Sequence, residues 1–175
     1  DAELDLAADV LANGKTSRLY RRLVYDDRVA TDVSASQNSR EAAGFLQVTA
    51  TAAPGRALAE IDRSVAEEIA RLAEDGPTED EIERCRVQAE AQFMFRLQNV
   101  GGFGGKSDQL NAYNVFTGDP GYFGRDLERY QYVTGAGLRD AVRRYLMRAE
   151  RVALSIIPRG RTALALAGSI PSSVS

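Results

Sequence analysis

Two neighbouring segments of this 175-residue chain carry apolar or small residues at every second position, and segments with helical spacing flank them. VATDVSASQ (29–37) and GFLQVTATA (44–52) predict two strands, which the turn at 38–43 joins into an antiparallel hairpin. The predicted inward faces are Val29, Thr31, Val33 and Ala35 in the first strand and Leu46, Val48 and Ala50 in the second. Strands grouped in this way favour an α+β fold, with a small, mainly antiparallel sheet and helices packed on it.

Elsewhere apolar residues recur every three or four positions, which predicts seven helices. They cover residues 2–12, 17–27, 54–76, 79–98, 107–118, 121–132 and a last helix that Thr134 caps. The clearest helix is the third, whose apolar stripe is Leu58, Ile61, Val65, Ile69 and Leu72. We expect Pro54 in its first turn and Gly76 at its end. Thr78 and Glu81 have the spacing of a capping box for the next helix.

A further strand is predicted at RVALSIIP (151–158), because this segment is rich in β-branched residues and ends at a proline. Three or four strands are few for so many helices. We therefore expect the sheet to lack its first strand and to leave an edge exposed. The expected organisation is one domain over residues 1–160, truncated at its start, and an extended tail or linker over residues 161–175.

The composition excludes several classes of site. The sequence has no histidine, so it cannot form a histidine-containing zinc site or a Ser-His or Cys-His pair. Its single cysteine, Cys85, is spaced as a small core residue and has no partner for an internal disulfide. The net charge is −3 with acidic and basic residues mixed, which argues against a nucleic-acid surface. No apolar run approaches the ~20 residues of a membrane span.

The glycine-rich stretch NVGGFGGKS (99–107) has the composition of a phosphate-binding loop but not its spacing. A phosphate loop needs glycine at position 100, where this chain has valine, and it follows a strand rather than a helix. A dinucleotide fingerprint fails because its third glycine position is Ser107. The stretch is interpreted as a break between two helices, and the expected mobile loop contains Gly101, Gly102, Gly104 and Gly105.

Acidic runs and serines give no further candidate active site. Glu67 and Glu68 are predicted on the solvated side of a helix, and residues 79–81 in a first turn, where negative charge complements the helix dipole. The serines considered as nucleophiles, none of them in a G-x-S-x-G elbow, are Ser17, Ser36 and Ser107. The residues alone therefore predict an α+β domain without a self-contained active site.

Longer segments carry a resemblance in their order and spacing. These are ADVLANGKTSRLYRRLVYDDRVATDVSAS, AGFLQVTATAAPGRALAEIDRSVAEEIARLAEDGPTEDEIERCR, FTGDPGYFGRDLERYQYVT, LRDAVRRYL and RVALSIIPRG. Together they resemble the C-terminal, non-catalytic domain of the pitrilysin/insulinase-like zinc metallopeptidases, over roughly residues 4–160. The resemblance implies the fold of one metallopeptidase half, as in the processing peptidases.

The resemblance also implies where the chemistry lies. The family's zinc site, His-x-x-Glu-His with a distal Glu, is carried on a different, amino-terminal domain. We therefore expect no cofactor in this chain and zinc in the parent's other domain. Some members use an Arg and a Tyr, seven residues apart, to hold substrate near the zinc. The corresponding positions are Val24 and Thr31, which depart from that pattern and cannot provide the same contacts.

The function implied is that of a non-catalytic domain of a zinc metalloendopeptidase. Such a domain helps to form the peptide-binding chamber and packs against the zinc-bearing domain of the same parent or a partner subunit. The alternatives are an inactive structural or adaptor relative of the same fold and an unrelated protein-interaction domain. Family resemblance points to the bacterial envelope or periplasm, and an exposed sheet edge predicts self-association into a homo-oligomer.

Overall fold

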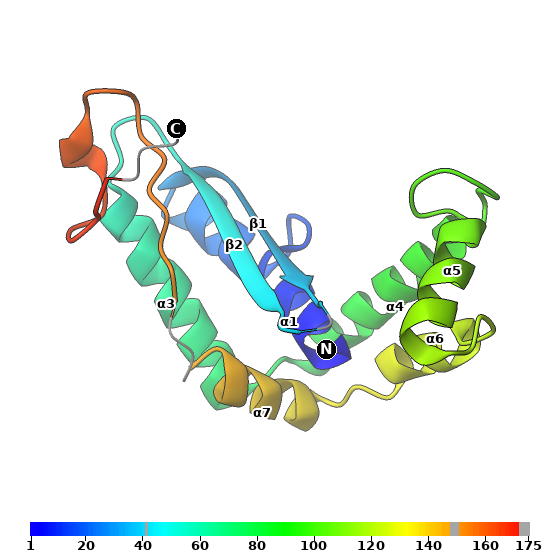
Figure 1. Cartoon of the computed structure of the whole chain (residues 1–175). Helices are drawn as coiled ribbons and strands as arrows, with labels where there is room; N and C mark the ends of the chain where they lie inside the picture. Colours follow the sequence, from blue (N-terminus) through cyan, green and yellow to red (C-terminus); the bar gives the residue numbers. More distant parts are fainter. Residues whose placement is uncertain (41, 148–150, 172–175) are drawn as a thin grey trace.

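The computed structural model describes residues 1–40, 42–147 and 151–171. Its elements in chain order are α1 (Ala2–Ala12), α2 (Arg18–Tyr20), the π-helix η1 (Arg21–Asp26), β1 (Ala30–Asn38), β2 (Phe45–Ala52), α3 (Leu58–Asp75), α4 (Glu79–Arg96), α5 (Lys106–Thr117), α6 (Phe123–Gln131), α7 (Gly135–Tyr145) and the 3₁₀ turn η2 (Thr162–Leu164). In the described ranges β1 and β2 form a two-stranded antiparallel sheet, which confirms the α+β fold. In Figure 1, α4 carries α5 and α6 away from the hairpin as a projecting helical arm.

The core is built around α1, which contacts the hairpin, α2, α4, α6 and α7. Its buried residues occupy nearly the whole circumference: Ala2, Leu6, Ala7, Ala8, Val10, Leu11 and Ala12. The helix is therefore central rather than amphipathic, and Leu6 in its middle is fully buried.

The hairpin has the predicted partners, but its inner face is shifted at one end. A bulge between Ala30 and Asp32 interrupts the register, so Ala30 and Val33 are buried while Thr31 is exposed. A bulge inserts one unpaired residue and turns the side chains beside it. The prediction that Thr31 faces inward is therefore wrong. The alternation in β2 is as predicted, with Leu46, Val48 and Ala50 half-buried.

The predicted helix over 17–27 is split into α2 and η1. Within η1 the amide of Asp27 donates to the carbonyl of Arg22, the i→i−5 pattern of a π-helix. Leu19 and Leu23 are buried. The next residue, Arg28, has φ of 51°, a left-handed conformation that redirects the chain into β1.

The boundaries of α3 and α4 are set by local caps. Gly76 ends α3 with φ of 77°, and Thr78 and Glu81 form both bonds of the capping box, as predicted. The start of α3 differs from the prediction, because Pro54 and the left-handed Gly55 form a turn and the helix begins at Leu58. Of its apolar stripe, Ile61 and Leu72 are buried while Leu58, Val65 and Ile69 are half-buried.

The predicted strand at 151–158 is wrong: these residues form no strand in the described part of the chain. The segment runs back along α3 and β2 (Figure 1) without joining the sheet. Strand propensity favours an extended backbone, but a strand also requires a neighbour at hydrogen-bonding distance. The sheet is correspondingly smaller than the three or four strands expected.

The projecting arm has a small aromatic core of its own. The ring of Phe93 in α4 contacts those of Phe123 and Tyr130 at centroid distances of 5.5 and 5.3 Å. The Tyr130 hydroxyl donates to Oδ2 of Asp5 in α1 at 2.6 Å, which ties the arm to the central helix. Burial and this hydrogen bond raise the pKa of Tyr130 well above its usual range, so the phenol stays protonated.

The last helix closes the domain against α1 and α3. The hydroxyl of Thr134 accepts a hydrogen bond from the amide of Gly137, which confirms the predicted cap. Leu138 and Val142 are fully buried, whereas Tyr145 is about half exposed.

Candidate functional site

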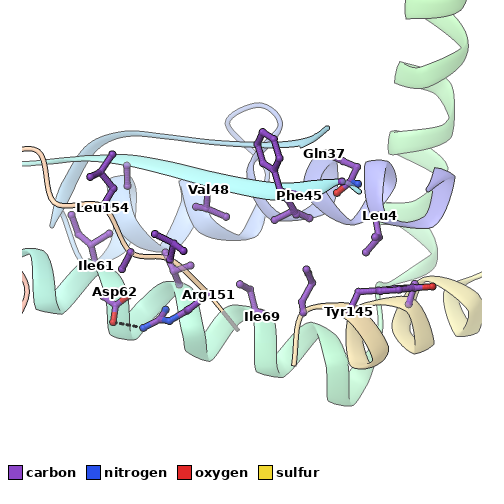
Figure 2. Close-up of a pocket in the computed structure, with 18 of the residues that line it drawn as sticks. Leu4, Gln37, Phe45, Val48, Ile61, Asp62, Ile69, Tyr145, Arg151 and Leu154 are labelled. Carbon is purple, nitrogen blue, oxygen red and sulfur yellow. Dashed lines mark hydrogen bonds and ion pairs between the residues drawn. The ribbon is translucent and has the colours of Figure 1, made fainter. Parts of the chain in front are cut away.

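A groove of about 870 Å³ lies between β2, α3 and the extended segment 151–155. Figure 2 shows Val48 directed into it from the strand, Ile61 and Ile69 from the helix, and Leu154 from the extended segment. Leu4 and Tyr145 lie at the opposite end. Three of the five stripe residues predicted as core, Leu58, Val65 and Ile69, therefore form groove wall while remaining half-buried.

The polar groups of this groove are positioned as an anchor rather than as reacting groups. Nη2 of Arg151 donates to Oδ2 of Asp62 at 2.8 Å, which ties the extended segment to α3 (Figure 2). In the described ranges no group of three His, Cys, Asp or Glu side chains could hold a metal ion. The apolar side chains of its lining are suited to binding an apolar partner.

The two positions assigned by resemblance lie outside this groove. Val24 is half-buried and packs against the core. Thr31 is exposed on β1, and its hydroxyl donates to the carbonyl of Thr51 at 3.3 Å. The structure does not bring the two side chains to a common cavity. Their place in a substrate chamber stays a prediction.

A second, polar groove of about 700 Å³ lies between η1 and the junction of α3 and α4. Nη1 of Arg22 donates to Oε1 of Glu68 at 3.0 Å, and Nη1 of Arg71 lies 3.2 Å from the same oxygen. Arg22 also pairs with Glu67 and Asp27. The prediction of a solvated Glu68 is wrong, because its side chain is buried beneath this network. The charges pair with one another, so the network is structural.

The glycine-rich stretch forms a hydrogen-bonded turn between α4 and α5. The amide of Lys106 donates to the carbonyl of Asn99 at 2.9 Å, and the amide of Gly104 to Oδ2 of Asp108 at 3.0 Å. Gly102 and Gly104 have φ of 83° and 77°, which favours glycine. Phe103 between them is fully exposed at the tip of the turn. Mobility of this loop stays a prediction.

We expect Gly105→Ala to destabilise this turn. A Cβ at position 105 would lie 2.7 Å from the carbonyl oxygen of Gly101 and 3.0 Å from that of Asn99, so the backbone must shift. We expect a loss of about 1–2 kcal/mol in the free energy of unfolding, measured by urea denaturation. The matched control is Gly101→Ala, where a Cβ meets nothing within 4 Å. Equal effects of the two substitutions would contradict the packing role.

The single cysteine has no sign of reactivity. Cys85 lies fully buried on α4. Burial, and then the nearby Asp9 carboxylate, raise the pKa of its thiol to about 11. The thiolate that nucleophilic or redox chemistry requires is therefore scarce at neutral pH. This agrees with the predicted role of a small core residue.

A sequence comparison identifies the class of protein. The family model described as the Peptidase M16 inactive domain matches residues 1–88 of the 175, just over half of the chain. The chain belongs to this family, which confirms the resemblance to the non-catalytic metallopeptidase half. No curated protein matches the chain. None of the described helices combines the length and apolarity that a membrane span requires.

Solved structures share the fold. The inactive peptidase domain of a candidate zinc protease from Bordetella parapertussis is 22% identical with a TM-score of 0.71, over 84% of this chain and 78% of that one. A protease from Helicobacter pylori is 18% identical with a TM-score of 0.70, over 83% of this chain and 34% of that one. A peptidase M16 inactive domain from Pseudomonas fluorescens is 16% identical with a TM-score of 0.66, over 82% and 34%. This chain therefore spans about a third of the length of the Helicobacter pylori and Pseudomonas fluorescens chains.

Proposed function

We propose that this chain is the non-catalytic half of a zinc metalloendopeptidase. In this role it packs against the zinc-bearing domain of its parent or of a partner subunit and forms part of the wall of a peptide-binding chamber. The observation that supports the proposal most strongly is the match of residues 1–88 to the inactive domain of the Peptidase M16 family. The shared fold with solved inactive domains supports it further.

The chemistry belongs to the other domain in this proposal. The chain contains no histidine, and its described residues bring no three carboxylate or thiol groups together around a metal position. Zinc therefore does not fit this chain, and no reaction step is assigned to its residues. The positions Val24 and Thr31 lack the guanidinium and phenol that would hold a substrate carbonyl. In this proposal the chain contributes part of the chamber wall and an apolar surface for packing, and it contributes no reacting group.

The arm presents the surface best suited to packing against another domain. Large apolar side chains lie exposed along α4, the glycine-rich turn and α5. The most exposed of them are Val87, Phe95, Val100, Phe103, Val115 and Phe116. Exposed apolar surface of this extent marks a site of protein interaction, and aromatic residues contribute most to such interfaces. We assign the contact with the zinc-bearing domain to these exposed residues of the arm.

Co-purification with the parent's zinc-bearing domain tests the proposal. We expect the isolated chain to bind no zinc and to cleave no fluorogenic peptide, and the two domains together to give cleavage that a chelator abolishes. Phe103→Ala should weaken the association at least tenfold, in the range of an aromatic interface residue. Tyr25→Ala, the loss of an exposed aromatic ring outside both the arm and the groove, is the control. Chelator-sensitive cleavage by the isolated chain, or no association, would refute the proposal.

The alternative is an inactive structural or adaptor relative of the same fold. It differs from the main proposal in one observable feature, the presence of a His-x-x-Glu-His motif in the parent gene or in that of the partner subunit. If both genes lack this motif, the adaptor function is favoured and the zinc peptidase is excluded.

A further inference from the structure

We propose that the contact between α1 and α6 is a pH-responsive latch, which holds the end of the projecting arm more tightly at acidic than at neutral pH. The latch consists of two half-buried carboxylates of α1, Asp5 and Asp9, and of Tyr130 in α6. This inference goes beyond the proposed peptidase role, and its test needs no second domain.

The acidic face of α1 is the first part of the latch. Asp1, Asp5 and Asp9 follow one another at intervals of four residues, so they lie on one side of the helix. Carboxylates at this spacing repel one another. The arm packs on α1 through α4 and α6, and Asp5 and Asp9 are half-buried in this contact. Docking of the arm therefore removes like charges from water, which costs free energy while they are ionised.

The hydrogen bonds to both carboxylates come from neutral groups. The hydroxyl of Tyr130 donates to Oδ2 of Asp5 at 2.6 Å, and Nδ2 of Asn13 donates to Oδ1 of Asp9 at 2.8 Å. A neutral donor can bind an oxygen of an ionised or of a protonated carboxyl group. Each carboxylate can therefore take up a proton on its second oxygen without losing the bond that holds it.

The charges that face Asp5 do not neutralise it directly. From α6 they are Arg129 and Asp126, and at the start of α1 the amino group of Asp1. The guanidinium of Arg129 pairs with the side chains of Asp1 and Asp126, at 3.0 Å from Oδ1 of the latter. Blocking the amino group would raise the pKa of Asp5 further, so this group is not the source of the effect.

The charges that face Asp9 leave it in a similar position. The neighbouring carboxylate Asp5 lies on the same helix, and Arg84 faces it from α4. Nη1 of Arg84 donates to the hydroxyl of Thr16 at 2.8 Å. The thiol of Cys85, the other titratable group on this side, is neutral at physiological pH because its pKa is raised to about 11.

These surroundings determine the sign of the pH dependence. Burial is the largest influence on Asp5 and Asp9 and raises the pKa of both above the ordinary 3.8, against the opposing effect of the hydrogen bonds. A carboxyl group whose pKa is higher in the closed latch binds its proton more tightly there. The closed latch is therefore most stable below the ordinary pKa, and it loses stability as pH rises through the raised values. This is the opposite of the behaviour of a salt-bridged carboxylate with a lowered pKa.

Hydrogen–deuterium exchange of the amides in 123–131 tests the latch in the full 175-residue chain. The rates are measured between about pH 4.5 and 7 and divided by those of an unstructured peptide of the same sequence. We expect the opening equilibrium constant of α6 to increase at least about threefold over this range, since each titrating carboxylate contributes up to about tenfold per pH unit. Glu81, with a pKa below 4.5, stays ionised throughout.

Two substitutions assign the pH dependence to the latch. Asp5→Asn imitates the protonated carboxyl group, so it should slow the opening at pH 7 and reduce the pH dependence. Tyr130→Phe removes the donor, so it should speed the opening about tenfold at pH 7 and less at pH 4.5, because the bond to an ionised acceptor is the stronger one. The matched control is Glu128→Gln, which removes a charge from the exposed side of α6 and should change the opening less than twofold.

The proposal is overturned if the opening constant of α6 stays the same or decreases from pH 4.5 to 7. It is also overturned if Asp5→Asn keeps the full pH dependence of the wild type. Should Asp5→Asn fail to fold, a carbon-13 NMR titration of the wild-type carboxyl groups decides the question. Values at or below the ordinary 3.8 for Asp5 and Asp9 would contradict the latch, and raised values would support it.

Discussion

Leu138→Ala is expected to lower the free energy of unfolding by about 2–5 kcal/mol, the range for a buried leucine that leaves a cavity. Leu138 is fully buried in α7, the helix that packs on both α1 and α3. Rigid neighbours on two sides limit how far the cavity can collapse. Urea denaturation followed by circular dichroism would measure the change.

The control for this prediction is Leu110→Ala in α5, the same chemical change at a side chain that is 51% exposed. Its expected effect is below about 1 kcal/mol, since little buried area is lost. A loss at Leu138 no larger than that at Leu110 would mean that α7 is not part of the cooperative core. The helix α7 would then unfold separately from the core formed by α1 and α3.

Local sequence signals predicted the helices well, because their determinants lie within a few residues of one another. The Thr78–Glu81 box, the Thr134 cap and the left-handed Gly76 each act over one helical turn, and all three have the predicted role. The burial of Cys85 on α4 followed from the same periodicity. These features need no knowledge of the rest of the fold.

Features that depend on distant partners were missed. Glu68 has the sequence context of a solvated residue, but Arg22, 46 positions earlier, meets it beneath the surface. Thr31 fits the alternating pattern, yet the bulge between Ala30 and Asp32 leaves it without a partner in β2 and turns it outward. Residues 151–158 have strand propensity, but no strand of the described chain lies within bonding reach. In each case the deciding interaction joins segments that sequence periodicity cannot place together.

The candidate groove was hidden from the sequence for the same reason. The stripe of α3 was predicted as core because a helix stripe of this width is normally covered. Only the arrangement in space shows that Val65 and Ile69 face a hollow rather than a packed layer. The first strand that the sequence analysis expected to be missing would likewise have covered apolar side chains of the sheet and α3. The missing first strand itself stays a prediction.

Glu81→Gln is expected to lower the free energy of unfolding by about 1.5–3 kcal/mol at pH 7, the range for hydrogen bonds to charged groups. Nε and Nη2 of Arg18 donate to the two carboxylate oxygens of Glu81 at 2.8 and 2.7 Å, and the side chains are 14% and 18% exposed. The pair joins α2 to the first turn of α4. Glutamine keeps one neutral oxygen as an acceptor for the capping box, but its amide nitrogen replaces the other carboxylate oxygen and cannot accept from Arg18.

The pH dependence distinguishes this ion pair from the cap. Burial alone would raise the pKa of Glu81, but hydrogen bonds from Arg18 and Thr78 outweigh it and hold the pKa below its ordinary 4.5. A carboxyl with a depressed folded-state pKa stabilises the fold above its unfolded pKa, and this stability is lost as pH falls through the folded value. The difference between wild type and Glu81→Gln should therefore be constant above about pH 5 and shrink as the pH is lowered below about 4. Glu79→Gln, at an exposed position in the same first turn, is expected to cost less than about 1 kcal/mol. A difference that persists unchanged at low pH would contradict the ionised Glu81 carboxylate as the source of the stabilisation.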